Sequence, residues 1–87
     1  MYYAYILQSI SHPVKFYYGS TRDLKKRVEV HNSGGNVSTK PNRPWRLQWY
    51  GAFETETGAM DFERYLKTAS GKAFARKRLL VVSGESL

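Results

Sequence analysis

Two short aromatic segments near the start of the chain, Tyr3-Ala4-Tyr5 and Tyr17-Tyr18-Gly19, decide the fold. Aromatic, β-branched and aliphatic residues fill positions 2–7 and 16–18, and such residues favour extended, half-buried backbone. The stretch between them contains Ser, His and Pro, which are typical of turns. The sequence therefore predicts a β-hairpin whose second strand ends at Gly19, a residue that allows either positive φ or the close approach of another group.

The composition describes one small domain with a strong positive charge. The 87 residues include 14 Lys and Arg against seven Asp and Glu, which gives a formal net charge of +7. This balance favours association with polyanions, nucleic acid before acidic membrane surfaces, although a merely solvated surface is also charged. The chain has no cysteine, so disulfides and thiolate metal sites are excluded.

The hydropathy pattern contains no targeting or membrane segment. The longest apolar run is far shorter than the roughly 20 residues that span a bilayer. Met1-Tyr2-Tyr3 lacks the basic start of a signal peptide. We therefore expect an intracellular protein with no membrane attachment, cytoplasmic or nucleoid-associated in a bacterium and nuclear in a eukaryote.

A first helix is expected after the hairpin. Ser20 and Thr21 offer capping hydroxyls, and Gly34-Gly35 predicts a stop after about Asn32. One stripe of this helix, at spacing i, i+3, i+4 and i+7, carries Leu24, Arg27, Val28 and His31. On spacing alone, a structural ion pair or a snorkelling side chain explains Arg27 better than catalysis does. An interior or rim position explains His31.

The middle of the chain predicts a loop and a third strand. Positions 33–44 are rich in Gly, Asn and Pro, a loop of about a dozen residues with positive charge from Lys40 and Arg43. Large residues alternate with polar ones from Trp45 to Phe53, which indicates a strand. We expect the alternating Trp45, Leu47 and Trp49 to include two core indoles.

Two further helices follow. Thr55 opens the first, in which Glu63 lies at the edge of the apolar stripe as either the partner of Arg27 or a metal ligand. Ser70 is expected to cap the second. Its inward residues are predicted to be Ala73, Phe74 and Leu79 or Leu80, and its outward residues Lys72, Arg76, Lys77 and Arg78. Positions 81–87 lack a pattern and predict a flexible tail.

These elements predict an α/β domain of the α+β kind over residues 1–80. Their order is strand, strand, helix, strand, helix, helix. A small three-stranded antiparallel sheet flanked by helices accommodates this order, because the first two strands are joined by a short turn.

The same residues resemble the GIY-YIG nuclease superfamily, over roughly positions 2–80, and that fold has the same element order. Within the superfamily the chain looks most like the small standalone bacterial-type proteins and the catalytic domain of the Slx-type structure-specific endonuclease subunit. The shared features are Tyr3-Ala4-Tyr5, Tyr17-Tyr18-Gly19-Ser20-Thr21, Arg27, His31-Asn32-Ser33-Gly34, Pro44-Trp45 and Glu63, and Thr39-Lys40 matches a Thr-rich stretch of the Slx-like domains.

This resemblance implies a metal-dependent endonuclease that hydrolyses DNA phosphodiester bonds, on branched or single-stranded DNA, in repair or recombination. Glu63 matches the single metal-binding carboxylate, which would hold Mg²⁺ or Mn²⁺ largely through water. Arg27 would contact the scissile phosphate. Tyr5 and Tyr17 match the two motif tyrosines, one of them the general base or water-positioning group. His31 matches a motif histidine that orients a tyrosine or the phosphate.

The match has departures. Tyr3 and Ala4 replace the Gly and Ile of the first motif, Tyr18 replaces the Ile of the second, and Ser20 stands where several members carry Lys. The alternatives are a catalytically weak nucleic-acid-binding module and a partner-binding subunit. Target choice would come from substrate shape, a protein partner or self-association. The residues expected to bind nucleic acid are Lys26, Lys40, Arg43, Lys72 and Arg76.

Overall fold

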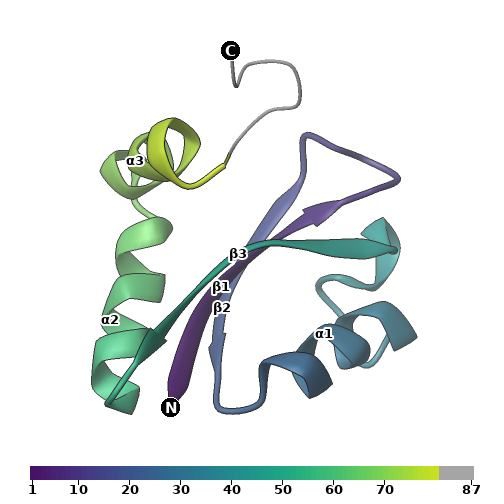
Figure 1. Ribbon diagram of the computed structural model, residues 1–87. Coiled ribbons are helices and arrows are strands. Elements are labelled where there is room, and N and C mark those ends of the chain that lie inside the picture. Colours follow the sequence, from purple (N-terminus) through teal and green to yellow (C-terminus); the bar gives the residue numbers. More distant parts are fainter. Residues whose placement is uncertain (81–87) are drawn as a thin grey trace.

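The computed structural model describes residues 1–80, in which three strands form one antiparallel sheet (Figure 1). The strands are β1 (Tyr2–Ser9), β2 (Phe16–Thr21) and β3 (Trp45–Phe53). β1 lies in the middle, so β2 and β3 are the edge strands. The predicted hairpin is confirmed, with Tyr5 opposite Gly19. The predicted end of its second strand is wrong, because β2 stays paired with β1 as far as Thr21.

Helices cover both faces of the sheet (Figure 1). Helix α1 packs on one face, and α2, with α3 against it, packs on the other. A short 3₁₀ helix, η1, lies in the loop before β3. The bounds are Leu24–Ser33 for α1, Lys40–Asn42 for η1, Glu56–Leu66 for α2 and Ala69–Arg78 for α3. The predicted element order is confirmed, and η1 is the one addition within residues 1–80.

The central strand supplies side chains to two separate cores. Successive side chains of a strand point to opposite faces, so Tyr5 and Leu7 face α1 while Ile6 faces α2. The α1-side core contains Tyr5, Leu7, Trp45, Tyr17, Leu24, Val28 and Leu47. The α2-side core contains Ile6, Leu66, Ala75, Phe16, Tyr18, Trp49, Phe62, Leu79 and Leu80.

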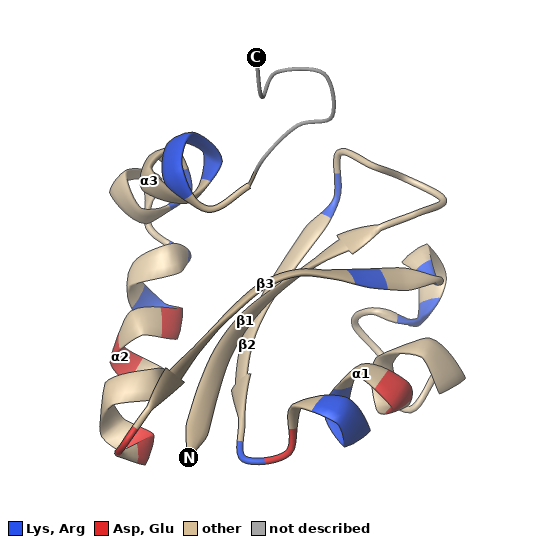
Figure 2. Cartoon of the chain, in the orientation of Figure 1, with Lys and Arg blue, Asp and Glu red and all other residues tan. Residues whose placement is uncertain are grey.

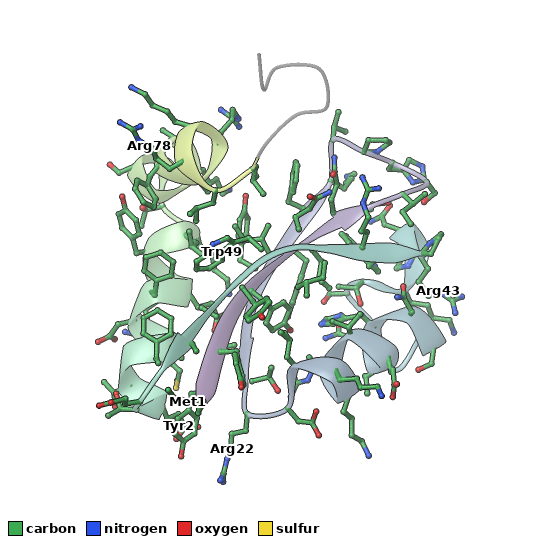
Figure 3. The ribbon with its side chains drawn as sticks, viewed as in Figure 1. Met1, Tyr2, Arg22, Arg43, Trp49 and Arg78 are labelled. Carbon is green, nitrogen blue, oxygen red and sulfur yellow. The ribbon has the colours of Figure 1, made fainter. Side chains whose placement is uncertain are left out.

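A β-bulge in β3 divides the two indoles between these cores. Leu47 is opposite Leu7 and Trp49 is opposite Ile6, so Gln48 is the extra residue between them. Trp45 lies in the α1-side core, whereas Trp49 packs on the other side, toward α2 (Figure 3). The predicted strand is confirmed. The predicted regular alternation of its side chains between the two faces is wrong, because the bulge reverses the face to which every later residue points.

The ends of α1 are fixed by local hydrogen bonds. The Asp23 carboxylate accepts a hydrogen bond from the Lys26 backbone N–H at 3.1 Å, so Asp23, and neither Ser20 nor Thr21, is the N-cap. Gly34 ends the helix with φ of 87°, which confirms the predicted stop. The Asn32 side chain then donates to the Trp45 carbonyl at 3.0 Å and accepts from the Trp45 backbone N–H at 2.6 Å. These two bonds join the end of α1 to the start of β3.

Helix α3 packs through its smallest residues, contrary to the prediction. Its N-cap is Thr68, not Ser70, and its buried residues are Gly71 and Ala75. Phe74, predicted to point inward, is 39% exposed. A methyl group at position 71 would overlap the backbone carbonyl of Tyr65, so α3 lies too close to α2 for a large side chain to fit between them. Ala73 is also exposed, whereas Leu79 and Leu80 lie inward as predicted.

The predicted tail, 81–87, lies outside the residues that the structure describes. Across residues 1–80, every helix is too short or too polar to traverse a bilayer.

The contact of Gly71 with α2 predicts an unusual response to Gly71→Ala. Replacing Gly by Ala in a helix ordinarily stabilises it by about 1 kcal/mol. Here the methyl group overlaps backbone, so we expect a loss of about 2 kcal/mol or more in the free energy of unfolding, measured by urea denaturation. The neighbouring exposed Ser70→Ala is the control, with a change within about 0.5 kcal/mol. A Gly71→Ala variant as stable as the wild type would contradict the packing of this corner.

Candidate active site

Tyr5 is the centre of the site. Its side chain is fully buried on the α1 face of the sheet and reaches across to β2 at Gly19. A Cβ atom at position 19 would overlap the Tyr5 hydroxyl and lie 2.6 Å from its Cζ atom. The close approach that the sequence offered as one role for Gly19 is therefore confirmed, and Tyr5 is the approaching group.

A chain of hydrogen bonds, here called the relay, runs from Tyr5 through His31 to Thr39 in the loop after α1. The Tyr5 hydroxyl lies 3.0 Å from His31 Nε2, and His31 Nδ1 lies 2.8 Å from Thr39 Oγ1. The Thr39 hydroxyl donates to the Asn36 carbonyl at 3.3 Å, so it accepts from His31. This assigns the proton of the neutral imidazole to Nδ1 and leaves Nε2 to accept the Tyr5 hydrogen.

Tyr17 completes an aromatic cluster with these two rings. It lies on β2, half-buried, with its ring centroid 4.7 Å from that of His31 and 6.3 Å from that of Tyr5. All three side chains come from the α1 side of the sheet. The structure therefore brings together three of the five predicted catalytic residues in direct contact.

Burial sets the protonation of the cluster. Burial raises the pKa of Tyr5 above its ordinary value, the neighbouring Tyr17 raises it further, and the Arg27 charge acts in the opposite direction. Burial also lowers the pKa of His31, with the Arg27 charge as the second cause. Both pKa shifts favour the neutral forms of the two side chains. Tyr5 then keeps its proton and donates a hydrogen bond to His31.

Arg27 lies beside this cluster and remains exposed to solvent. It precedes His31 by one turn of α1, and residues four apart occupy neighbouring positions on a helix surface. Its charge influences the pKa of both Tyr5 and His31. Within residues 1–80, the Arg27 guanidinium is thus the one positive group whose charge affects both Tyr5 and His31.

Glu63 approaches from the other face of the sheet, across β2. Its Oε1 atom accepts a hydrogen bond from the Ser20 hydroxyl at 2.7 Å, and Ser20 is the neighbour of Gly19 in that strand. Its Oε2 atom pairs with Lys67 Nζ at 2.8 Å. Glu63 therefore pairs with Lys67. The alternative in which Glu63 is the ion-pair partner of Arg27 is wrong. The charge of Glu63 is still among the influences that raise the pKa of Tyr5.

The donor set around Glu63 suits one kind of metal site. Residues 1–80 contain no group of three or more His, Asp or Glu side chains arranged to share an ion. Glu63 is 20% exposed, so one carboxylate oxygen can reach solvent once Lys67 moves. A single carboxylate fits a hard cation such as Mg²⁺ that keeps most of its water ligands.

The five residues predicted to bind nucleic acid fall into two groups (Figure 2). Lys72 Nζ lies 6.0 Å from the Tyr18 ring centre. Burial raises the pKa of Tyr18, and the charge of the nearby Arg76 lowers it. Lys72 and Arg76 therefore flank β2 on the same face as Glu63. The other group, on α1, η1 and the residue after it, consists of Lys26, Lys40 and Arg43.

One groove is separate from these residues. It has a volume of about 680 Å³, and its lining residues come from β1, β3 and the first part of α1 with the turn before it. It is lined by Tyr3, Arg22, Asp23, Leu24, Lys25, Val28, Glu29, Leu47 and Tyr50. The predicted catalytic residues instead meet at β2, the opposite edge strand.

Three residues of the site were missed as functional groups by the sequence reasoning. Thr39 stood out in the sequence only as part of a matching stretch, and Ser20 only as a departure from the family pattern. Their hydrogen bonds join residues eight and 43 positions apart, and no local periodicity reports contacts of that kind. Lys67 could have been found, because it follows Glu63 by four residues on a helix.

Comparison with known families agrees with this arrangement. The model of the GIY-YIG catalytic domain matches residues 1–78. This chain belongs to the GIY-YIG family. The suspected resemblance is confirmed, and so is the fold that it implied.

Several relatives of this GIY-YIG domain have curated descriptions. The structure-specific endonuclease subunit slx1 of Talaromyces stipitatus is 40% identical over 68 residues, which cover 71% of this chain and 18% of that protein. The corresponding SLX1 subunit of Kluyveromyces lactis is 40% identical over 70 residues, 71% of this chain and 24% of that protein. The UPF0213 protein YazA of Bacillus subtilis is 43% identical over 58 residues, 66% of this chain and 59% of that protein. The chain thus spans less than two thirds of each.

The buried His31 predicts a stability that falls in mild acid. Its folded pKa is lower than the ordinary 6.5, so below that pH the unfolded chain binds more protons and the free energy of unfolding decreases. We expect a slope of up to about 1.4 kcal/mol per pH unit below about pH 6.5, measured by urea denaturation. His31→Gln should flatten this slope while keeping the exposed His12. Equal slopes in both proteins would contradict a buried neutral His31.

The acceptor at Thr39 predicts different effects for two substitutions. Thr39→Val preserves the shape of the side chain but leaves the buried Nδ1–H of His31 without an acceptor. We expect a loss of about 1–3 kcal/mol in the free energy of unfolding and a changed ¹⁵N chemical shift for the His31 ring. Thr39→Ser retains the hydroxyl and should keep the shift near that of the wild type. An unchanged ring spectrum in Thr39→Val would show that Thr39 does not hold the tautomer.

Proposed function

We propose that this GIY-YIG domain is a divalent-metal-dependent endonuclease that hydrolyses DNA phosphodiester bonds at the free edge of β2. One observation carries the proposal. The Tyr5–His31 relay, with Tyr17 and Arg27 beside it, lies on one side of this single strand, and Glu63 lies on the other. A phosphate at the edge of β2 would have access to both sides.

Arg27 supplies the charge that phosphodiester cleavage needs. Negative charge on the phosphate oxygens must be neutralised as the attacking and leaving oxygens exchange. The guanidinium of Arg27 is exposed, and its planar set of donors matches phosphate oxygens. We assign it the contact with the scissile phosphate.

The two tyrosines take different roles in this proposal. Tyr5 is fully buried, and its proton is directed to His31, so it acts as the inner end of the relay. Tyr17 is half-buried at the edge strand and contacts the His31 ring. We therefore place the attacking water at Tyr17, whose hydroxyl orients it while the relay holds the ring in place. A phenol with an ordinary pKa near 10 is a weak base on its own.

Glu63 is the residue that would hold Mg²⁺ or Mn²⁺. Ser20 fixes Oε1, whereas Oε2 is held only by the half-exposed Lys67, so Oε2 is the oxygen that can exchange its partner. A bound cation would supply an acidified water and stabilise the leaving oxygen. Lys67, once released, is positioned on α2 to contact the same phosphate. Its charge compensates for the lysine that Ser20 replaces.

We propose that target choice depends on the structure of the DNA and on a partner protein. The names of the fungal and yeast relatives describe structure-specific endonuclease subunits, and the chain carries a net charge of +7. We extend the proposal to branched or single-stranded DNA in repair or recombination, with a partner protein selecting the target.

The second candidate is a nucleic-acid-binding module without efficient cleavage. The ion pair that occupies Glu63 Oε2 favours it.

Substitution of Glu63 and Arg27 tests the cleavage proposal. With Mg²⁺ or Mn²⁺, the wild type is expected to cut plasmid or forked DNA, and EDTA should abolish cutting. Glu63→Gln keeps the shape but removes the charge, and Arg27→Ala removes the phosphate contact. Each should lower the cleavage rate by at least about 100-fold, measured on gels, because each removes one electrostatic contribution to the transition state. DNA binding in EDTA should remain within a few-fold of the wild type.

Glu29→Gln provides the matched control, because Glu29 is an exposed carboxylate of α1 with no place in the relay. It should cut at the wild-type rate. Cleavage by Glu63→Gln at the wild-type rate would refute the metal-ligand assignment. Salt-sensitive binding by a folded wild type that never cuts would instead establish the binding module.

A further inference from the structure

A row of aromatic rings crosses α2 and reaches α3. The ring centroids of Trp49 and Phe62 are 5.5 Å apart, those of Phe62 and Tyr65 5.9 Å, and those of Tyr65 and Phe74 6.1 Å. The row begins in the α2-side core and ends at the surface. Tyr65 is 38% exposed and Phe74 is 39% exposed. The outer two rings, Tyr65 and Phe74, therefore form one exposed aromatic surface, called the aromatic step below.

The charge around this step is positive. Helix α3 contains four basic residues and no acidic one. Lys77 and Arg78 follow Phe74 by three and four residues, which places them next to it on the helix surface, and Figure 3 shows Arg78 on the outside of α3. The nearby acidic residue Asp61 is already neutralised by Arg64 at 3.0 Å.

We propose that Tyr65 and Phe74 form a stacking surface for unpaired bases of single-stranded nucleic acid, with Lys77 and Arg78 contacting its phosphates. Aromatic rings in a positively charged setting bind single strands because every base has a π-face and every nucleotide a phosphate. A fully paired duplex offers this step only its phosphates, since its bases are stacked on one another.

This surface is distinct from the proposed catalytic edge. Phe62 contacts Trp49 of β3, whereas Glu63, the next residue, bonds to Ser20 of β2, so the two lie toward opposite edges of the sheet. A single-stranded arm on the Tyr65–Phe74 step would leave the β2 edge free for the scissile phosphate. The inference deepens the proposed function, but it concerns binding and does not require cleavage.

Charge also separates nucleic acid from a second copy of the chain as the occupant. Two copies joined through this step would bring Lys77 and Arg78 of each against the same residues of the other. With a net charge of +7 per chain, that contact is repulsive, whereas a polyanion is attracted.

Binding to labelled oligonucleotides in EDTA tests the proposal, because no cleavage intervenes and the result is independent of the proposed activity. The double variant Tyr65→Leu, Phe74→Leu removes the rings but keeps apolar volume. We expect about tenfold weaker binding of a single-stranded oligonucleotide by fluorescence anisotropy, and duplex binding within about twofold of the wild type. Tyr50→Leu is the matched control, an exposed tyrosine of β3 on the α1 face, and should change neither.

Three further measurements decide between explanations. Phe74→Trp should retain or strengthen single-strand binding, which distinguishes stacking from loss of fold. Lys77→Gln with Arg78→Gln should reduce the slope of log affinity against log salt by about 0.7 for each phosphate that the variant no longer neutralises. Equal weakening of single-strand and duplex binding in the leucine variant, or no weakening of either, would overturn the proposal. So would a wild-type dimer in sedimentation that the leucine variant disrupts.

Discussion

The contact between the Tyr5 hydroxyl and Gly19 is the constraint on which the site depends. Because position 19 carries no side chain, a tyrosine of the central strand can extend beneath the edge strand and still reach His31. Any larger residue there would displace the phenol and break the relay at its first bond. Gly19 is therefore needed because it leaves room for the Tyr5 ring, and its backbone is ordinary extended strand.

The relay is stable because its members are matched in burial and in proton direction. Tyr5, His31 and Thr39 are all buried, and each polar atom among them has a partner. An unpartnered group at that depth would cost about 1–3 kcal/mol, so the three positions constrain one another. The loop after α1 is consequently part of the site, although its Thr39 carries neither a charge nor a reacting atom.

Local pattern predicted the features that depend on neighbouring residues. The hairpin, the glycine stop of α1 and the shared helix stripe of Arg27 and His31 all follow from periodicity and capping, and the structure has them. The bulge at Gln48 and the exposure of Phe74 did not follow, because each depends on how separate elements pack. The position of Glu63 across β2 was hidden for the same reason. Sequence spacing shows which face of a helix a residue occupies, but not which face of the sheet that helix covers.

The division of the site between two layers has a consequence for partial unfolding. Every member of the relay precedes residue 40, whereas Glu63 belongs to α2, which packs on the opposite face through Ala59 and Leu66. Local opening of a helical layer costs less free energy than global unfolding. Detachment of α2 and α3 alone would separate the carboxylate from an otherwise intact aromatic cluster. In the proposed endonuclease, such a detachment would remove the metal ligand while the bonds among Tyr5, His31 and Thr39 stay formed.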